Sequence, residues 1–408
     1  MSGYLPPHYR PGEGLCSEVY KAEYDVKPGD ISGGTEEIKD YWLAVPKDVV
    51  PTINTLITLA PTTGEELIKV QPLGFGLWGW GDVLTYGWGP SSGYDQKLND
   101  ESIHGAWKAI FQRSTNVLLD TAEYYGYTDG YSEKKVGDFF CEDQDAGTLD
   151  RSRVVLATKF LPTPWRHPWR YPDITLSAFN GSIQRTRLGG IDIYQLHGPS
   201  HAGYWPRLET LCDALVCAYK TGRCKAIGTC NLSFQQVKLV YTHLKRNNVP
   251  LVSNQVEFSL VRQDPWTEGM IERCHKLGLT TPSIAVIAYS PIALGRLTGK
   301  YDRRNRPRGN RNFGNIDWDK IQPIVDELKR VGAKVNKSPA AVALNWVICK
   351  GAIPIPTVKN REQVVDCLQA LGWRLDQDDE NRLDVLGVTN SPDYHLLQHL
   401  QNWWWQQG

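Results

Sequence analysis

The sequence contains no apolar run that approaches the roughly 20 residues needed to span a bilayer. Its first twenty residues, MSGYLPPHYRPGEGLCSEVY, lack the hydrophobic region of a secretory signal. Acidic residues recur through the first forty positions, which is unlike an organelle transit peptide. We therefore expect a soluble, intracellular protein.

An excess of charge of either sign is also absent, because Lys plus Arg and Asp plus Glu number 45 each. A strongly basic balance is typical of nucleic-acid-binding proteins, so the bulk charge argues against that class of partner. The 9 cysteines include no CxxC pair and show no regular metal-ligand spacing. We interpret them as reduced intracellular thiols and expect no metal site.

The chain does contain enough apolar sequence for a sizeable core: hydrophobic residues make up 41% and charged residues 22% of its 408 residues. One large domain is compatible with this length, because (β/α) barrels often use about 250 residues or more as a single unit. We predict an N-terminal extension over 1–66 that wraps on the main domain, a main domain over 67–376, and a helical C-terminal tail over 377–408.

Short apolar runs alternate with amphipathic segments along the main domain. The runs have the length and composition of buried strands and cover residues 70–78, 115–122, 153–160, 191–198, 224–231, 250–258, 284–291 and 351–358. Helical patterns lie between them, for example at Glu101–Gln112, Leu208–Lys220, Phe234–Lys245 and Pro339–Cys349.

Strands that alternate with helices favour parallel pairing with right-handed crossovers. Eight such repeats predict an α/β fold closed into a (β/α)8 TIM barrel. The strand count by itself leaves an open, doubly wound sheet as the alternative.

A glycine pattern in the first run has a misleading form. Gly74, Gly76 and Gly79 match the dinucleotide-binding pattern G-x-G-x-x-G. That motif works by opening a helix whose N-terminus faces a pyrophosphate. The next residues, GWGDVLTYGWGPSSG, are too rich in glycine to form that helix. We interpret the match as accidental.

Four titratable residues fall at the ends of successive predicted strands. Asp120 and Tyr125 follow the second run, Lys159 lies in the third, and His197 ends the fourth. In a barrel, the carboxyl ends of all strands meet at one mouth, so these side chains are expected to converge. A lysine beside a phenol favours its ionised form, a carboxylate positions the lysine, and an imidazole binds a substrate oxygen. This set suits the protonation of a carbonyl that receives a hydride.

The motifs around these residues identify a family. The ordered segments LGFGLWGWGD, LLDTAEYYG, VVLATKF, DIYQLHGP, IGTCNLS, NQVEFS, AYSPIALGRLTGKY and IPIPTVKNREQV resemble those of the aldo-keto reductases, over about 67–376. The LGFGLWGWGD and WGP elements look most like the plant and cyanobacterial plastid-type members, so the compartment is expected to be the cytoplasm or a plastid. The resemblance implies a catalytic tetrad of Asp120, Tyr125, Lys159 and His197, with Tyr125 as the proton donor.

The resemblance also implies NADPH as the cofactor, with NADH as the second candidate, bound across the barrel mouth without a Rossmann fold. The residues that it assigns to the cofactor are Gly76, Leu77, Trp78, Cys230, Asn231, Gln255, Tyr289, Ser290, Ile292, Gly295, Leu297, Lys300, Lys359, Gln363 and Asp366. Lys359 is expected to pair with a 2′-phosphate, and a solvated helix start is its alternative role. Thr357 replaces the usual glycine and Cys367 the usual asparagine, which weakens the inference for the adenosine end.

Three aromatic residues, Trp78, Trp80 and Trp88, are expected to line the mouth and to favour an aromatic or apolar carbonyl substrate, with core packing as the competing role for at least one of them. The basic loop at 300–315 could close over phosphates or be a solvated insertion. Leu396, Leu397, Leu400, Trp403 and Trp404 share one face of a predicted tail helix. That face is expected to dock on the barrel, on a protein partner or on a membrane surface.

A second class of function stays open at this stage. The barrel could be a cofactor-sensing subunit of a larger assembly, with little turnover, as the potassium-channel β subunits of the same family suggest. The long N-terminal extension, the Trp-rich tail and the altered adenosine residues favour this alternative.

Overall fold

A computed structural model describes residues 43–59, 68–89, 95, 97–126, 130–163, 166, 168–199, 206–277, 284–309 and 316–389. These residues belong to one compact unit, 41–408. The expected hydrophobic face at 396–404 lies outside the described residues, as does most of the expected N-terminal extension.

The centre of the fold is an eight-stranded parallel sheet whose neighbours follow the order of the sequence. Its strands are β3 (Phe75–Gly76), β4 (Val117–Asp120), β5 (Val154–Phe160), β6 (Ile191–Leu196), β7 (Cys224–Cys230), β8 (Leu251–Glu257), β9 (Ala285–Tyr289) and β10 (Ile353–Pro354). Each lies within one of the eight apolar runs, so the predicted strands are confirmed.

Hydrogen bonds between the first and last strands close the sheet. The amide of Gly74 donates to the carbonyl of Pro354 at 3.0 Å, and that of Gly76 donates to Pro356 at 3.0 Å. Gly76 and Thr357 also form a parallel bridge. The predicted (β/α)8 barrel is therefore confirmed, and the open doubly wound sheet is wrong.

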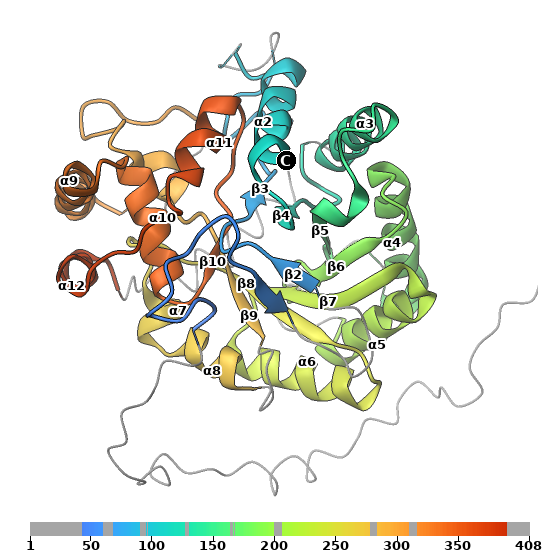
Figure 1. Cartoon of the computed structure of the whole chain (residues 1–408). Helices are drawn as coiled ribbons and strands as arrows, with labels where there is room; N and C mark the ends of the chain where they lie inside the picture. Colours follow the sequence, from blue (N-terminus) through green and yellow to red (C-terminus); the bar gives the residue numbers. More distant parts are fainter. Residues whose placement is uncertain are drawn as a thin grey trace, which may run out of the picture. The chain divides into compact units, whose positions relative to one another are not determined.

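Helices surround this barrel, as Figure 1 shows. They are α2 (Asp100–Arg113), α3 (Tyr131–Asp145), α4 (Asp173–Thr186), α5 (Leu208–Ala218), α6 (Phe234–Arg246), α7 (Asp264–Thr267), α8 (Met270–Leu277), α9 (Trp318–Val335), α10 (Pro339–Cys349), α11 (Arg361–Leu368) and α12 (Gln377–Leu386). None of the helices in the described ranges is long and apolar enough to cross a membrane.

Local sequence explains where several of these helices begin and end. Asn99 and Ser233 begin α2 and α6 with reciprocal side-chain to backbone hydrogen bonds. Ser338 caps α10, and Pro339 occupies its first turn, where a missing amide hydrogen costs nothing. The α5 pattern was expected to run to Lys220, but the α-helix ends at Ala218 and continues as one wider turn to Arg223. Gly222, with a φ of 72°, stops the helix there.

A hairpin covers the end of the barrel where the strands begin. Its strands, β1 (Ile57–Leu59) and β2 (Ile68–Val70), pair antiparallel, and the amide of Gln71 donates to Asn116, just before β4. β2 crosses the centre of the ring in Figure 1. The expected boundary at residue 66 falls between these two strands, so the segment at 43–59 belongs to the barrel unit.

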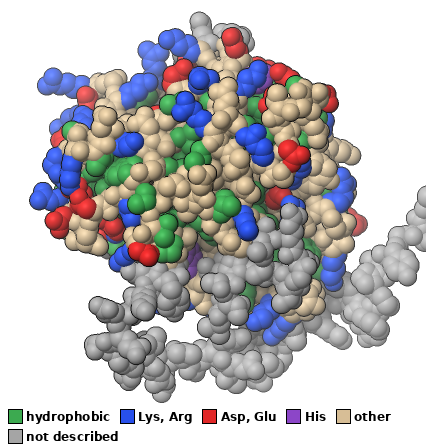
Figure 2. Space-filling model, viewed as in Figure 1, with side chains coloured by type: hydrophobic (Ala, Val, Ile, Leu, Met, Phe, Trp, Pro, Cys, Tyr) green, Lys and Arg blue, Asp and Glu red, His purple; other side chains and the backbone are tan. Residues whose placement is uncertain are grey.

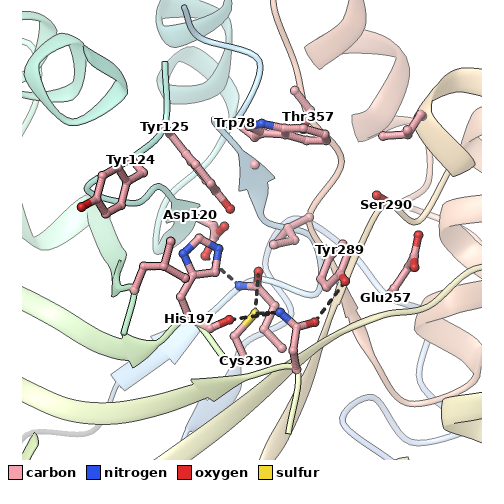
Figure 3. Close-up of a pocket in the computed structure, with 16 residues that line it drawn as sticks. Trp78, Asp120, Tyr124, Tyr125, His197, Cys230, Glu257, Tyr289, Ser290 and Thr357 are labelled. Carbon is pink, nitrogen blue, oxygen red and sulfur yellow. Dashed lines mark hydrogen bonds between the residues drawn. The ribbon is translucent and has the colours of Figure 1, made fainter. Parts of the chain in front are cut away.

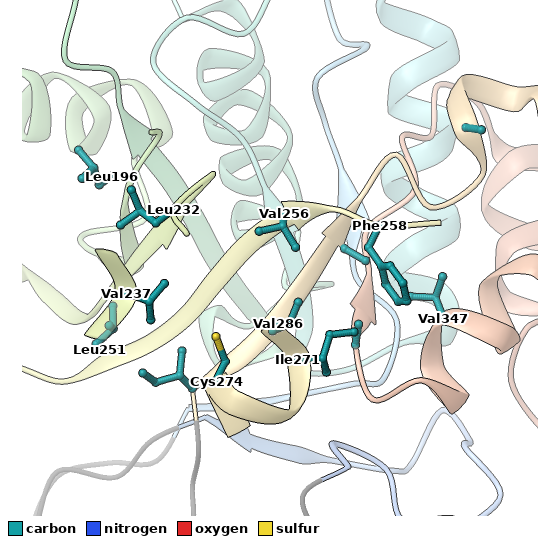
Figure 4. Packing of buried hydrophobic residues seen from close by; sticks show 14 of the residues in the cluster. Leu196, Leu232, Val237, Leu251, Val256, Phe258, Ile271, Cys274, Val286 and Val347 are labelled. Carbon is teal, nitrogen blue, oxygen red and sulfur yellow. The ribbon is translucent and has the colours of Figure 1, made fainter. Parts of the chain in front are cut away.

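Two clusters of buried apolar side chains form the core. Figure 4 shows part of the first cluster, which contains Val256 and Val286 of the sheet and Val237, Ile271 and Val347 of the surrounding helices. Burial of such side chains stabilises a fold by about 1.5–3 kcal/mol each. On the face in Figure 2, basic and acidic side chains are both spread over the surface, without a stripe of one sign.

Candidate active site

The carboxyl ends of the strands carry the four residues that the sequence singled out. Asp120 is the last residue of β4, Lys159 is the penultimate residue of β5, and His197 directly follows β6. Tyr125 lies in the turn after β4, where its amide donates to the carbonyl of Ala122. Figure 3 shows Asp120, Tyr125 and His197 grouped in one pocket.

Lys159 connects the acid and the phenol. Its Nζ atom lies 2.6 Å from Asp120 Oδ2, 2.9 Å from the Tyr125 hydroxyl and 2.9 Å from the carbonyl oxygen of Thr121. These three acceptors use all three ammonium hydrogens of a side chain with no solvent exposure. The ammonium is therefore fixed in place.

The Asp120 carboxylate is fixed from its other side by two amides. Gln255 Nε2 donates to Oδ1 at 2.7 Å and Gln195 Nε2 donates to the same oxygen at 3.0 Å. Gln195 can extend inwards because its neighbour on β7 is Gly228, where a Cβ atom would lie 2.8 Å from the Gln195 side chain. Sequence reasoning missed Gln195, although it shares a strand face with His197, two residues further on.

Burial controls the ionisation of the phenol and the imidazole. Burial raises the pKa of Tyr125 above its ordinary value, and the neighbouring Lys159 cation offsets only part of that rise. Burial disfavours the charged form of Lys159, but Asp120, Tyr125 and Cys230 together outweigh burial and raise the lysine pKa. Burial and then Lys159 lower the pKa of His197 well below its ordinary value. The pocket therefore contains a protonated phenol, an ammonium and a neutral imidazole at neutral pH.

His197 lies beside the phenol, with ring centroids 5.8 Å apart at an interplanar angle of 75°. The backbone holds it in place, because its amide donates to Phe160 at 2.8 Å and its carbonyl accepts from Asn231 Nδ2 at 3.0 Å. Its buried Nδ1 atom has no hydrogen-bond partner among the described residues. The ring also lines the pocket, where it can exchange a hydrogen bond with a ligand.

Amide-bearing and aromatic side chains line the other half of the pocket. Tyr289 donates from its hydroxyl to Asn231 Oδ1 at 3.0 Å, and Asn231 Nδ2 donates to Cys230 Sγ at 3.2 Å. Burial raises the pKa of the Cys230 thiol to about 12, so it stays neutral. A flat face and paired amides are suited to an aromatic carboxamide such as nicotinamide.

The loop after β9 has backbone conformations that suit a phosphate ligand. Ser290, Ala293, Leu294 and Gly295 have positive φ angles of 50°, 51°, 53° and 96°. Left-handed residues of this kind next to right-handed ones turn successive amides towards one side and make an anion-binding concavity. Three of the four carry a side chain in this strained region, which is typical of ligand clamps. The residues present therefore fit a nicotinamide dinucleotide.

The expected cofactor residues fall into two groups. Seven of them line the pocket: Gly76, Trp78, Cys230, Asn231, Gln255, Tyr289 and Ser290. The others lie outside the described lining. Ile292, Gly295 and Leu297 are in the loop after β9, and Lys300 follows that loop. Leu77 directly follows β3 and is buried, and Gln363 and Asp366 are in α11.

The alternative role of Lys359, a solvated residue at the start of a helix, does not agree with its position. Its side chain is 9% exposed, and Nζ lies 4.1 Å from the centroid of the Tyr86 ring. Its backbone amide donates to Gln363 Oε1 at 2.8 Å, which fixes the start of α11. The backbone around Lys359 is therefore held in one conformation, as a binding residue requires.

The three expected mouth tryptophans differ in their positions. Trp78 lines the pocket, with its ring 5.3 Å from that of Tyr86. The expectation for Trp80 is wrong: it has no solvent exposure, and its indole donates to the carbonyl of Val358 at 2.9 Å. Trp88 is half-buried against Tyr131 and is not part of the described lining. Tyr124, Leu161, Leu294 and Ile355 line the pocket instead, together with Glu257 and Thr357.

Comparison with known proteins agrees with this geometry. The model of the Aldo/keto reductase family matches residues 72–387. The chain therefore belongs to the aldo/keto reductase family and is an oxidoreductase of that family.

Individual relatives agree with this family assignment. The chain is 36% identical over 322 residues to chloroplastic pyridoxal reductase from Arabidopsis thaliana, covering 78% of this chain and 83% of that protein. It is 31% identical to an uncharacterised oxidoreductase from Mycobacterium tuberculosis, covering 72% of this chain and 83% of that one. The structure of a glycerol dehydrogenase from Gluconobacter oxydans superposes with a TM-score of 0.61 at 22% identity, covering 81% and 94% of the two chains, which supports the barrel fold.

Proposed function

We propose that this protein reduces an aldehyde or ketone to an alcohol, with a hydride from NADPH and a proton from Tyr125. The observation that carries the proposal is the position of Lys159 Nζ, within hydrogen-bonding distance of both the Tyr125 hydroxyl and Asp120 in one pocket. That arrangement is suited to proton donation to a carbonyl oxygen.

Each side chain has a distinct task in this reaction. The nicotinamide, when bound, supplies the hydride to the carbonyl carbon. Tyr125 donates its proton to the carbonyl oxygen, and the Lys159 cation, 2.9 Å away, stabilises the phenolate that remains. Asp120 keeps the ammonium in place, and the neutral ring of His197 orients the substrate oxygen through a hydrogen bond.

The cofactor would be held by both halves of the site. Asn231, Gln255 and Cys230 would bind the carboxamide, and Tyr289 would stack on the nicotinamide ring. The loop from Ser290 to Leu297 would bind the pyrophosphate through its amides. Lys359, with Gln363 and Asp366 further along α11, would contact the adenosine end and favour NADPH over NADH.

We expect a small aromatic aldehyde as the substrate. Trp78 and Tyr124 both line the pocket, and Tyr124 is held by Arg166, whose guanidinium lies 5.5 Å from its ring centroid. Aromatic walls favour flat ligands. The similarity to a pyridoxal reductase makes pyridoxal the first compound to test.

The test is the oxidation of NADPH by the purified chain with pyridoxal, benzaldehydes, quinones and short ketones, each with NADH in parallel. We expect turnover of aromatic aldehydes with NADPH, and a loss of about a hundredfold or more in the Tyr125→Phe variant. Lys359→Met should weaken NADPH and leave NADH unchanged. A panel with no turnover under any condition would contradict the proposal.

The cofactor-sensing subunit is the competing function, and size-exclusion of native extract separates the two. A free species near the chain mass of 46.0 kDa favours the enzyme. A persistent large complex, combined with absent turnover, favours the subunit.

A further inference from the structure

The pocket contains a buried carboxylate that the proposed reaction does not use. Glu257, the last residue of β8, is 4% exposed and lines the pocket. It lies two residues after Gln255, so both side chains project from the same face of the strand. Its register partner on β9 is Tyr289, and Figure 3 shows the two side by side on the wall opposite Tyr124.

An ion pair favours the charged form of this group. Arg262, which is 2% exposed, places Nε 2.9 Å from Glu257 Oε2. Burial raises the pKa of Glu257, and the Arg262 cation opposes that rise. Oε1 receives no hydrogen bond from the described residues, so the carboxylate presents an open acceptor to the pocket.

The short turn after β8 makes this arrangement rigid. The amides of Ser259 and Arg262 donate to each other's carbonyls at 3.2 and 2.9 Å. The chain beyond α12 pairs with the same turn, since Val388 donates to Leu260 at 2.9 Å and accepts from Gln263 at 3.1 Å. Arg262, and with it Glu257, is therefore held from both sides.

We propose that Glu257 is a cofactor-binding residue that accepts a hydrogen bond from the nicotinamide riboside half of the dinucleotide, through a ribose hydroxyl or the carboxamide N–H. This inference rests on the proposed function. An anionic carboxylate repels phosphate, so among the groups of NADPH it suits the neutral hydroxyl and amide donors. Its position beside Tyr289 places that donor near the expected nicotinamide ring.

The experiment is a titration of intrinsic tryptophan fluorescence with NADPH and, separately, with 2′,5′-ADP, which lacks the nicotinamide riboside. Glu257→Gln should weaken NADPH binding about tenfold or more, as expected for the loss of a hydrogen bond to a charged group. Binding of 2′,5′-ADP should stay unchanged.

Two further variants separate binding from stability. Glu257→Gln combined with Arg262→Gln also removes the buried cation that Glu257 neutralises, so stability should recover while NADPH binding stays weak. Glu133→Gln is the matched control, because Glu133 is equally buried and paired with Arg185 but does not line the pocket. It should bind NADPH as the wild type does.

The outcomes distinguish this inference from the proposed function. Wild-type affinity for NADPH in Glu257→Gln, with turnover intact, would overturn the role of Glu257 alone. Wild-type affinity for NADPH together with a raised KM for the aldehyde would show that Glu257 binds the substrate and not the cofactor. That outcome would also overturn the inference. Failure of the wild-type protein to bind NADPH would overturn both.

Discussion

Lys159 donates a hydrogen bond to the hydroxyl of Tyr125, with Nζ 2.9 Å from the phenol oxygen, and the ammonium has no solvent exposure. The net pKa of Tyr125 is nonetheless raised, because burial outweighs the cation. The phenol therefore keeps its proton until a substrate oxygen accepts it, and the lysine stabilises the anion that follows. This pair underlies the first prediction.

Tyr125→Phe should reduce kcat by about a hundredfold to ten-thousandfold, the usual contribution of a general acid. The ring and its contacts with Lys159 and His197 are kept, so NADPH should bind as before. Steady-state kinetics together with fluorescence titration will check this. Turnover equal to wild type would exclude Tyr125 as the acid.

Asp120→Asn should destabilise the fold, because it leaves the fully buried Lys159 without its counter-charge. Breaking a buried ion pair costs about 3–5 kcal/mol. The matched control is Asp100→Asn, whose pair with Lys135 is partly exposed and should contribute only about 0–1 kcal/mol. Urea denaturation measures both free energies of unfolding. Equal losses would contradict the prediction.

Acid should destabilise the protein partly through His197. Its pKa is depressed in the folded state, whereas the unfolded chain takes up a proton near the ordinary value of about 6.5. The unfolded state therefore gains protons first, and stability falls as the pH drops below that value. His197→Gln should flatten this part of the stability profile, measured by thermal melts over a pH series. Parallel profiles for both proteins would contradict it.

Trp78 and Trp80 should respond differently to the same change. Trp80→Ala removes a fully buried indole and its hydrogen bond to Val358, so it should cost about 3–5 kcal/mol of stability. Trp78→Ala should raise the KM for aromatic aldehydes and cost much less stability, because its ring lines the pocket. Denaturation and kinetics on both variants measure this contrast. A large stability loss in Trp78→Ala would contradict it.

The sequence alone determined the strand order and the convergence of the four polar residues. Apolar runs of strand length alternate with amphipathic helices, and this pattern admits few topologies once crossovers are right-handed. In a closed barrel all carboxyl ends meet at one mouth. The positions of Asp120, Lys159 and His197 at strand ends therefore predicted that they would lie together, and the structure places them so.

The tertiary structure decided which side chains reach the pocket and which are buried in the core. Trp78 and Trp80 are two residues apart and would share a face in a continuous strand, but β3 ends at Gly76 and the amide of Trp80 turns back to Leu77. One ring therefore reaches the pocket and the other the core. The ionisation of Tyr125 and the open carboxylate of Glu257 likewise depend on burial. Burial is set by side chains from distant segments packing together, which no local pattern contains.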